Sequence, residues 1–267
     1  MTAKISTLYT YPLKSGQKVC HSKIKLEEMG LEGDREFVIV DENGDFLSQR
    51  KIPQMALLRL IKLDQEKVLV ESPSRSITLK KTAHSRLIKV WDDTVESDAY
   101  GVLEGIDFLP QGASLFQINP KKPRHIKKKH TQNSIVPYGF ADGFPLLIAS
   151  ESSLKVINSL LQKEGHPSIP MSRFRPNIVI SGWEPFWEHK IKEIVIDNRI
   201  KIKLPKPCTR CIMTTIDQSL GVAKGKEPLA ALKKLASETG GLFFGQNGYL
   251  TENGGTLKPG QTVTSIQ

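Results

Sequence analysis

The chain has 267 residues, of which 39% are hydrophobic and 25% charged, with a mean hydropathy of -0.28 and a formal net charge of +10. This composition is typical of a soluble globular protein with room for one or two domains around a buried core. No run of 18 apolar residues occurs and the first residues lack a long apolar segment, so the sequence supports neither a membrane span nor a secretory signal, and we expect a cytoplasmic protein.

The first 95 residues contain short apolar and β-branched segments separated by turn residues, a spacing that predicts an antiparallel β domain. The clearest hairpin is expected at residues 41–45, because the pair Asn43-Gly44 accepts the positive φ that tight turns require. The expected strands are residues 5–11, 23–26, 35–41, 45–49, 56–64, 67–71 and 76–80.

Residues 121–130 carry the densest positive charge, with six lysines and arginines and two histidines. Pro120 and Pro123 and the absence of apolar periodicity predict an exposed loop. Three interpretations stay open: a solvated surface, a docking patch for an acidic electron donor, and a nucleic-acid site. Nucleic acid is the weakest of the three, because no aromatic side chains are interleaved with the charges.

The second half alternates strand and helix patterns. Residues 142–148 predict a turn followed by a buried strand, and Ser150 begins a helix that runs to about Glu164 and ends at Gly165. A hairpin is expected at residues 193–204, a short helix at 227–237 and closing strands at 242–246 and 254–263.

The triplet Arg175-Pro176-Asn177 precedes another expected strand. Pro176 restricts the local backbone, which leaves a guanidinium and a carboxamide on opposite sides of it as hydrogen-bond donors. Arg175 therefore predicts a ligand contact or, alternatively, a salt bridge that braces two domains.

Residues 206–217, Lys-Pro-Cys-Thr-Arg-Cys-Ile-Met-Thr-Thr-Ile-Asp, hold two of the three cysteines, with an arginine between them, and run into an apolar stretch typical of a strand. A thiolate is a ligand for soft metals, and a neighbouring guanidinium lowers a thiol pKa and binds phosphate. Metal affinity and anion affinity thus coincide at Cys208, Arg210 and Cys211.

A cysteine pair has three other common roles in proteins: a structural zinc site, a redox pair and inert core residues. Structural zinc needs four ligands, but Cys20 and the nearest histidines show no ligand spacing. A thioredoxin-like redox pair opens a helix, whereas prolines precede this pair and β-branched residues follow it. Two inert, buried cysteines remain an open alternative.

The cysteine motif, followed by Gly221-Val222 and by Lys-Glu-Pro-Leu at 226–229, resembles the core of the MOSC family (molybdenum cofactor sulfurase C-terminal domain). It is most similar to the branch that contains the mitochondrial amidoxime-reducing component and its bacterial relatives. Tyr-Pro-Leu-Lys-Ser at 11–15 and Leu-Glu-Gly-Asp-Arg-Glu-Phe at 31–37 resemble the signatures of the N-terminal β-barrel domain that precedes MOSC. The resemblance covers almost the whole chain.

The resemblance implies a mainly β protein of the α+β class, with an N-terminal β-barrel-like domain over residues 1–95 and a MOSC mixed β-barrel with peripheral helices over 96–267. It also implies a short helix after a strand pair near residue 100. A molybdenum–pyranopterin cofactor would bind between the domains, with Cys211 as the catalytic residue and metal ligand. The residues implied to hold the cofactor are Lys14, Ser15, Arg35, Arg175, Asn177, Thr209 and Arg210. Phe144 departs from the small polar residue of the relatives.

The implied reaction is reduction of small N-hydroxylated molecules (amidoximes, hydroxylamines and N-hydroxylated nucleobases) to amine and water. No cysteine follows Cys211, so we expect no ferredoxin domain and a separate electron-transfer protein instead, such as a ferredoxin, a flavodoxin or a cytochrome b5-like protein. The alternative is a sulfur carrier that delivers persulfide from Cys211. The pyridoxal-phosphate-binding half of the sulfurases, a family-level property, is not expected here.

Overall fold

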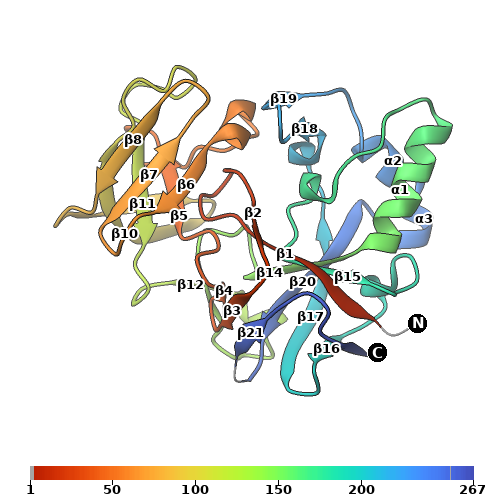
Figure 1. The fold of residues 1–267 in the computed structure, drawn as a ribbon. Coiled ribbons are helices and arrows are strands. Elements are labelled where there is room, and N and C mark those ends of the chain that lie inside the picture. Colours follow the sequence, from red (N-terminus) through yellow and green to blue (C-terminus); the bar gives the residue numbers. More distant parts are fainter. Residues whose placement is uncertain (1–2, 253) are drawn as a thin grey trace.

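The computed structural model describes residues 3–252 and 254–267, so Asn253, in the expected turn before the last strands, lies outside the described residues. The chain is mainly β with a few helices and forms two units (Figure 1). The N-terminal unit consists of smaller sheets, and the second unit is built on a large central sheet. In Figure 1 the smaller N-terminal sheets lie on the left and the helices α1 to α3 on the right. No helix in the described part of the chain is long and apolar enough to cross a membrane.

The central sheet has eight strands in the order β2-β1-β15-β14-β20-β17-β16-β22. Neighbouring strands are antiparallel except β14 and β15, which are parallel and are joined by helix α1 (Glu151–Lys163), because parallel neighbours need a crossover connection. The strands are β1 (Lys4–Thr10), β2 (Val19–His21), β14 (Leu146–Ser150), β15 (Ile178–Ser181), β16 (Glu193–Ile196), β17 (Ile200–Thr209), β20 (Phe243–Leu250) and β22 (Val263–Ile266).

The N-terminal unit contains a four-stranded sheet, β5-β11-β10-β9, and a three-stranded meander, β6-β7-β8. The expected domain division at residue 95 falls within β10, which pairs with β9 and β11 along its length. The strands are β5 (Phe37–Val40), β6 (Arg59–Lys62), β7 (Lys67–Glu71), β8 (Ser76–Lys80), β9 (Ser85–Val90), β10 (Asp93–Val102) and β11 (Ser114–Ile118).

Shorter elements complete the fold. Three small sheets consist of β3 (Ile24–Glu27) with β4 (Gly30–Leu31) and β21 (Gly255–Leu257), β12 (Arg124–His125) with β13 (Pro137–Tyr138), and β18 (Ile216–Asp217) with β19 (Val222–Ala223). The remaining helices are α2 (Leu229–Lys234), α3 (Ala236–Thr239) and the 3₁₀ segments Pro53–Leu57, Lys128–His130, Met171–Arg173, Trp187–His189 and Ile212–Thr215.

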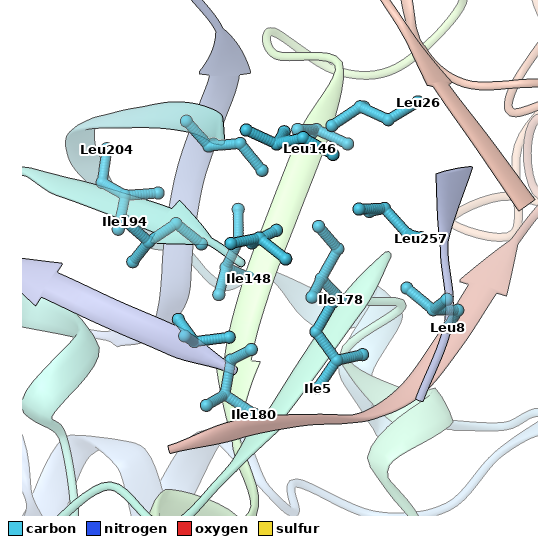
Figure 2. Close-up of a cluster of buried hydrophobic side chains, with 14 of the residues drawn as sticks. Ile5, Leu8, Leu26, Leu146, Ile148, Ile178, Ile180, Ile194, Leu204 and Leu257 are labelled. Atoms are coloured by element: carbon cyan, nitrogen blue, oxygen red, sulfur yellow. The ribbon is translucent and has the colours of Figure 1, made fainter. Parts of the chain in front are cut away.

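The largest core lies against one face of the central sheet (Figure 2). Ile5 and Leu8 of β1 point toward Ile178 and Ile180 of β15, with Ile148 of β14 beside them, and all five side chains are at most 1% exposed. A second cluster packs α1 and α2 on the sheet. Burial of β1 against β15 explains why the first strand of the chain joins this sheet rather than the N-terminal unit. Alternation showed that residues 5–11 form a strand, but not which partner it takes.

Two expected elements are wrong and a third is confirmed only in part. Within residues 45–49, Asp45 and Phe46 form isolated bridges and no strand is present. The short helix near residue 100 is absent from the described structure, since Tyr100 belongs to β10 and the apolar side chains after it turn back into the core of the N-terminal unit. The apolar stretch after Cys211 begins as a 3₁₀ turn, because the hydroxyls of Thr214 and Thr215 donate to the carbonyls of Cys211 and Ile212, and only its last two residues form a short strand, β18. The strand at the cysteine motif, β17, precedes it.

Candidate functional site

One cavity of about 310 Å³ lies where the N-terminal unit meets the central sheet. It is lined by side chains from both units and falls in the size range of small-molecule sites. Every site residue predicted from the sequence lines it: Lys14, Ser15, Arg35, Arg175, Asn177, Thr209, Arg210 and Cys211. The structure thus brings together residues spread over almost 200 positions of sequence, while their individual roles remain predictions.

Three of these residues have an unusual backbone. Ser15, Arg35 and Arg175 adopt φ values of 67°, 48° and 56°, in the left-handed region that non-glycine residues rarely occupy. Such conformations cost about 1–3 kcal/mol each and persist where surrounding contacts hold them. Here the amide of Arg35 donates to the carbonyl of Tyr11 at 2.9 Å, and that of Arg175 to Ser172 at 3.2 Å. Strained, well-held backbone of this kind clusters at functional sites.

The guanidinium groups of Arg35 and Arg175 both lie over the ring of Tyr11. The guanidinium carbons of Arg35 and Arg175 lie 4.4 and 4.1 Å from the centroid of Tyr11, which is 1% exposed. Arg35 also donates to the buried carboxylate of Asp34 at 2.5 Å, whereas Arg175 donates to the carbonyl of Gly16 at 2.7 Å. Burial, and then the neighbouring Arg35, lower the pKa of Arg175 to about 10, so it stays charged near neutral pH. The charge of Arg175 has no direct carboxylate partner within the described chain.

Asn177 is used by the protein itself. Its Oδ1 accepts from Arg35 Nη1 at 3.0 Å and from the amide of Leu147 at 3.1 Å, and its Nδ2 donates to the carbonyl of Tyr9 at 3.2 Å. With 1% exposure, the side chain is a brace that fixes Arg35 between β1, β14 and β15. A side-chain hydrogen bond of Asn177 also favours the ionised form of the Asp34 carboxyl, so the amide is used mainly within the protein.

Lys14 is buried, with 6% of its side chain exposed, and donates to the carbonyl of Phe140 at 2.8 Å and to Asp142 at 2.5 Å. Burial lowers the pKa of Lys14, and the Asp142 carboxylate opposes this change. Desolvation by the cavity wall would raise the pKa of Asp142, whose side chain is half-exposed, but Lys14 and Arg50 beside it hold that pKa well below its usual range. Asp142 therefore stays ionised and holds both cations in place.

Arg50 and Asp142 are functional candidates that the sequence did not indicate, because neither lies in a recognised motif. Arg50 Nη2 lies 3.2 Å from Asp142 Oδ2 and 3.5 Å from Cys211 Sγ, and its guanidinium stacks on Trp91 at 4.6 Å. The indole nitrogen of Trp91 donates to the same carboxylate at 3.3 Å. Arg50 thus links the N-terminal unit to Cys211.

The cysteine motif leaves β17 at the cavity wall. Cys208 and Cys211 are both half-buried free thiols, and Thr209 between them is exposed. Arg210 donates to Cys208 Sγ at 2.9 Å and to the carbonyl of Phe174 at 2.8 Å, while its buried Nε has no partner among the described residues. Within residues 3–252 and 254–267, neither cysteine belongs to a group of three side chains that could hold a metal ion. The group that could do so is Glu164, His166 and Glu227, which is largely exposed and contains no cysteine.

The cavity carries a large excess of positive charge. Seven cationic side chains line it against one carboxylate, that of Asp142. The cations are Lys14, Arg35, Arg50, Arg173, Arg175, Lys206 and Arg210. Fixed guanidinium groups, an orphaned buried Nε and an accessible thiol suit an anionic ligand that also carries a soft metal, which is the chemistry of a molybdenum–pyranopterin phosphate.

The basic loop adjoins this cavity and is only partly the free surface that the sequence predicted. Arg124 is buried and donates to Asp93 at 2.8 Å and to the carbonyl of Ala141 at 2.6 Å. Lys127, Lys128 and Lys129 are exposed. His130, at the end of the loop, packs on Phe144 of the cavity wall with ring centroids 5.7 Å apart. The three exposed lysines thus directly precede the residue that joins the loop to the cavity wall.

Comparisons with known proteins agree in both halves of the chain. Residues 2–102 match the model of the MOSC N-terminal β-barrel domain, and residues 136–264 match that of the MOSC domain. The human protein named mitochondrial amidoxime-reducing component 1 is 29% identical, over 97% of this chain and 82% of its own. A rice protein named molybdenum cofactor sulfurase is 28% identical, over 90% of this chain and 32% of its own. Among solved structures, the YUAD protein from Bacillus subtilis aligns over 100% of this chain and 98% of its own, with 16% identity and a TM-score of 0.45.

Proposed function

Because this chain belongs to the MOSC family, with an N-terminal MOSC β-barrel domain followed by a MOSC domain, we propose that it binds a molybdenum–pyranopterin cofactor and reduces N-hydroxylated compounds. The observation that carries this proposal is the single cavity where the Cys211 thiol meets an excess of fixed cations. Relatives named amidoxime-reducing components, similar over nearly the whole chain, support the choice of reaction.

Each residue is assigned by its free bonding capacity. Arg175 and Arg210, which have no carboxylate partner in direct contact, would hold the cofactor phosphate and pterin together with Ser15 and Thr209. Lys14 and Arg35 carry charges already paired with Asp142 and Asp34, so they would contribute a second, shared contact. Asn177 positions Arg35.

Cys211 would provide the protein thiolate to the metal, and its place at the end of β17 keeps it at the cavity wall. The bound cofactor supplies a redox metal able to exchange two electrons and an oxygen atom. The protein contributes orientation, a positive field that favours anions, and partial exclusion of water by Phe140, Phe144 and Phe174, which line the same cavity. Amidoximes, hydroxylamines and N-hydroxylated nucleobases are the proposed substrates.

Electrons would come from a separate acidic protein, a ferredoxin, a flavodoxin or a cytochrome b5-like protein. Lys127, Lys128 and Lys129 are exposed in the loop whose last residue, His130, packs on the cavity wall, and opposite charge steers such encounters. We place the reaction in the cytoplasm.

A second candidate is a sulfur carrier in which Cys211 holds a persulfide. The similarity to a protein named molybdenum cofactor sulfurase and the half-buried, unpaired thiol favour it. This role needs the thiol but not a bound metal, and that difference separates the two candidates.

Metal and pterin content decides between them. Protein purified from a cofactor-competent host should contain molybdenum and pterin in near-equal amounts and should reduce benzamidoxime with an artificial electron donor. Cys211→Ala should abolish the reduction, whereas the matched variant Cys208→Ala should keep much of it. Full turnover and full metal content in Cys211→Ala would overturn the assignment. Protein that lacks both metal and pterin but carries a persulfide on Cys211 would support the sulfur carrier.

A further inference from the structure

We propose that Arg50 forms a subsite beside Cys211 for an anionic group, so that the preferred substrate carries a negative charge such as a carboxylate or a phosphate. The identity of the substrate as an N-hydroxylated compound rests on the proposed function. The anionic subsite itself rests on Arg50 and the charges around it.

Arg50 lies beside Cys211 in the cavity. Its Nη2 lies 3.5 Å from Cys211 Sγ, so a molecule that reaches the sulfur comes within contact distance of the guanidinium. Arg50 is half-buried, whereas Arg175 is buried. Arg50 therefore lies toward the mouth of the cavity and Arg175 lies deeper.

Neighbouring side chains fix the orientation of the Arg50 guanidinium. Stacking on Trp91 at 4.6 Å and the bond to Asp142 at 3.2 Å fix the plane of the guanidinium. Both polar contacts that the described chain makes with Arg50 use Nη2. Nη1 and Nε thus keep hydrogens for a ligand, one on each edge of the guanidinium, and charge-assisted bonds from a fixed cation are suited to a carboxylate or a phosphate.

Cations outnumber carboxylates in the part of the cavity around Arg50. Asp142 is shared by Lys14 and Arg50, so a single carboxylate faces two cations there. Lys206 and Arg210 add two more cations to the cavity lining, and no salt bridge to a carboxylate forms at either within the described residues. The mouth of the cavity can therefore hold a second anion, in addition to a cofactor phosphate bound deeper at Arg175. Asp142 is the one carboxylate of the described lining that would repel it.

The test measures the preference of Cys211 for an anionic over a neutral reagent in cofactor-free protein. An equimolar mixture of iodoacetate and iodoacetamide labels the thiols, and trypsin then places Cys20, Cys208 and Cys211 on separate peptides for mass spectrometry. Both reagents attack the same thiolate, so their product ratio is independent of the ionised fraction and reports the local field. The exposed Cys20 in the same digest is the internal reference.

We expect the iodoacetate-to-iodoacetamide ratio at Cys211 to exceed that at Cys20 and to fall about three- to tenfold in Arg50→Gln. Arg50→Lys should restore most of the ratio, since it returns the charge. The matched control Arg59→Gln removes an exposed arginine of the same unit, paired with Glu71, and should leave the ratio unchanged. An unchanged ratio in Arg50→Gln overturns the subsite.

A second measurement uses cofactor-loaded enzyme and two substrates that differ by one carboxylate, benzamidoxime and 4-carboxybenzamidoxime. The ratio of their kcat/KM values, charged over neutral, should fall about fivefold in Arg50→Gln and stay unchanged in Arg59→Gln. Equal ratios in wild type and Arg50→Gln overturn the substrate preference. If loaded wild-type enzyme reduces neither compound, the proposed function fails, and the labelling ratio still decides whether the anionic subsite exists.

Discussion

Replacing Glu188 with glutamine should make the protein more stable at neutral and alkaline pH. Glu188 is 0% exposed, Ser153 donates to its Oε2 at 2.9 Å, and its Oε1 has no partner among the described residues. Burial raises the pKa of Glu188 from 4.5 to about 7. The folded state therefore favours the neutral carboxyl, and the stability that it contributes is present below pH 4.5 and is lost as pH rises through about 7. A pKa difference of this size corresponds to roughly 3 kcal/mol.

The neighbouring His189 acts in the opposite direction. Burial lowers the pKa of His189 from 6.5 to about 4, so the folded state favours the neutral ring and loses stability as pH falls from 6.5 toward 4. The two residues therefore oppose each other between pH 4.5 and 6.5, where their contributions to the pH dependence of stability largely cancel. Removing the Glu188 carboxyl should expose the histidine contribution as a rise in stability with pH.

Urea unfolding followed by circular dichroism at pH 4.5, 6 and 8 measures the effect. The free energy of unfolding of Glu188→Gln minus that of wild type should grow by roughly 3 kcal/mol from pH 4.5 to 8. Comparing two proteins at each pH cancels the contributions of other titrating groups. Glu184→Gln, which changes an exposed carboxyl on the same segment, is the control and should follow wild type. A constant difference across this pH range would refute the argument that the fold keeps Glu188 protonated.

Three further predictions concern the cavity and its entrance. Arg210→Gln should lower pterin content about tenfold, because a charge-assisted bond contributes roughly 1.5–3 kcal/mol, and Arg210→Lys should recover part of it, as measured by pterin fluorescence. Replacing Lys127–Lys129 by serine should reduce donor-dependent turnover and its salt dependence together, because salt screens these charges over a length of about 8 Å. Turnover with a neutral chemical reductant is the control and should not change. A wild-type salt profile in the triple variant would place the docking site elsewhere. Gly139→Ala should lower the Tm, because a Cβ there would lie 2.7 Å from the carbonyl oxygen of Arg35, whereas Gly143→Ala, with no atom within 4 Å, should not.

Much of the local structure followed from the sequence alone. The alternating apolar pattern of β7 and β8 reproduced their bounds, and burial of Val68 and Val70 on one face is the reason. The expected helix α1 was confirmed. Ser153, Ile157 and Leu161 lie four residues apart, so they share one buried face of it. The fold class and the family were confirmed as well. These features depend on side-chain periodicity and on contiguous motifs, which the sequence displays directly.

The working geometry of the site was decided by tertiary structure. The two bonds of Arg50 join residues 92 and 161 positions apart, and no local pattern marks such a pair. Asn177 looked like a ligand donor in sequence, yet packing of β1, β14 and β15 around it leaves it mainly as a brace for Arg35. Periodicity reports which side chains are buried, whereas the partner of a buried charge depends on which distant strands pack together, and that choice is made by the core as a whole.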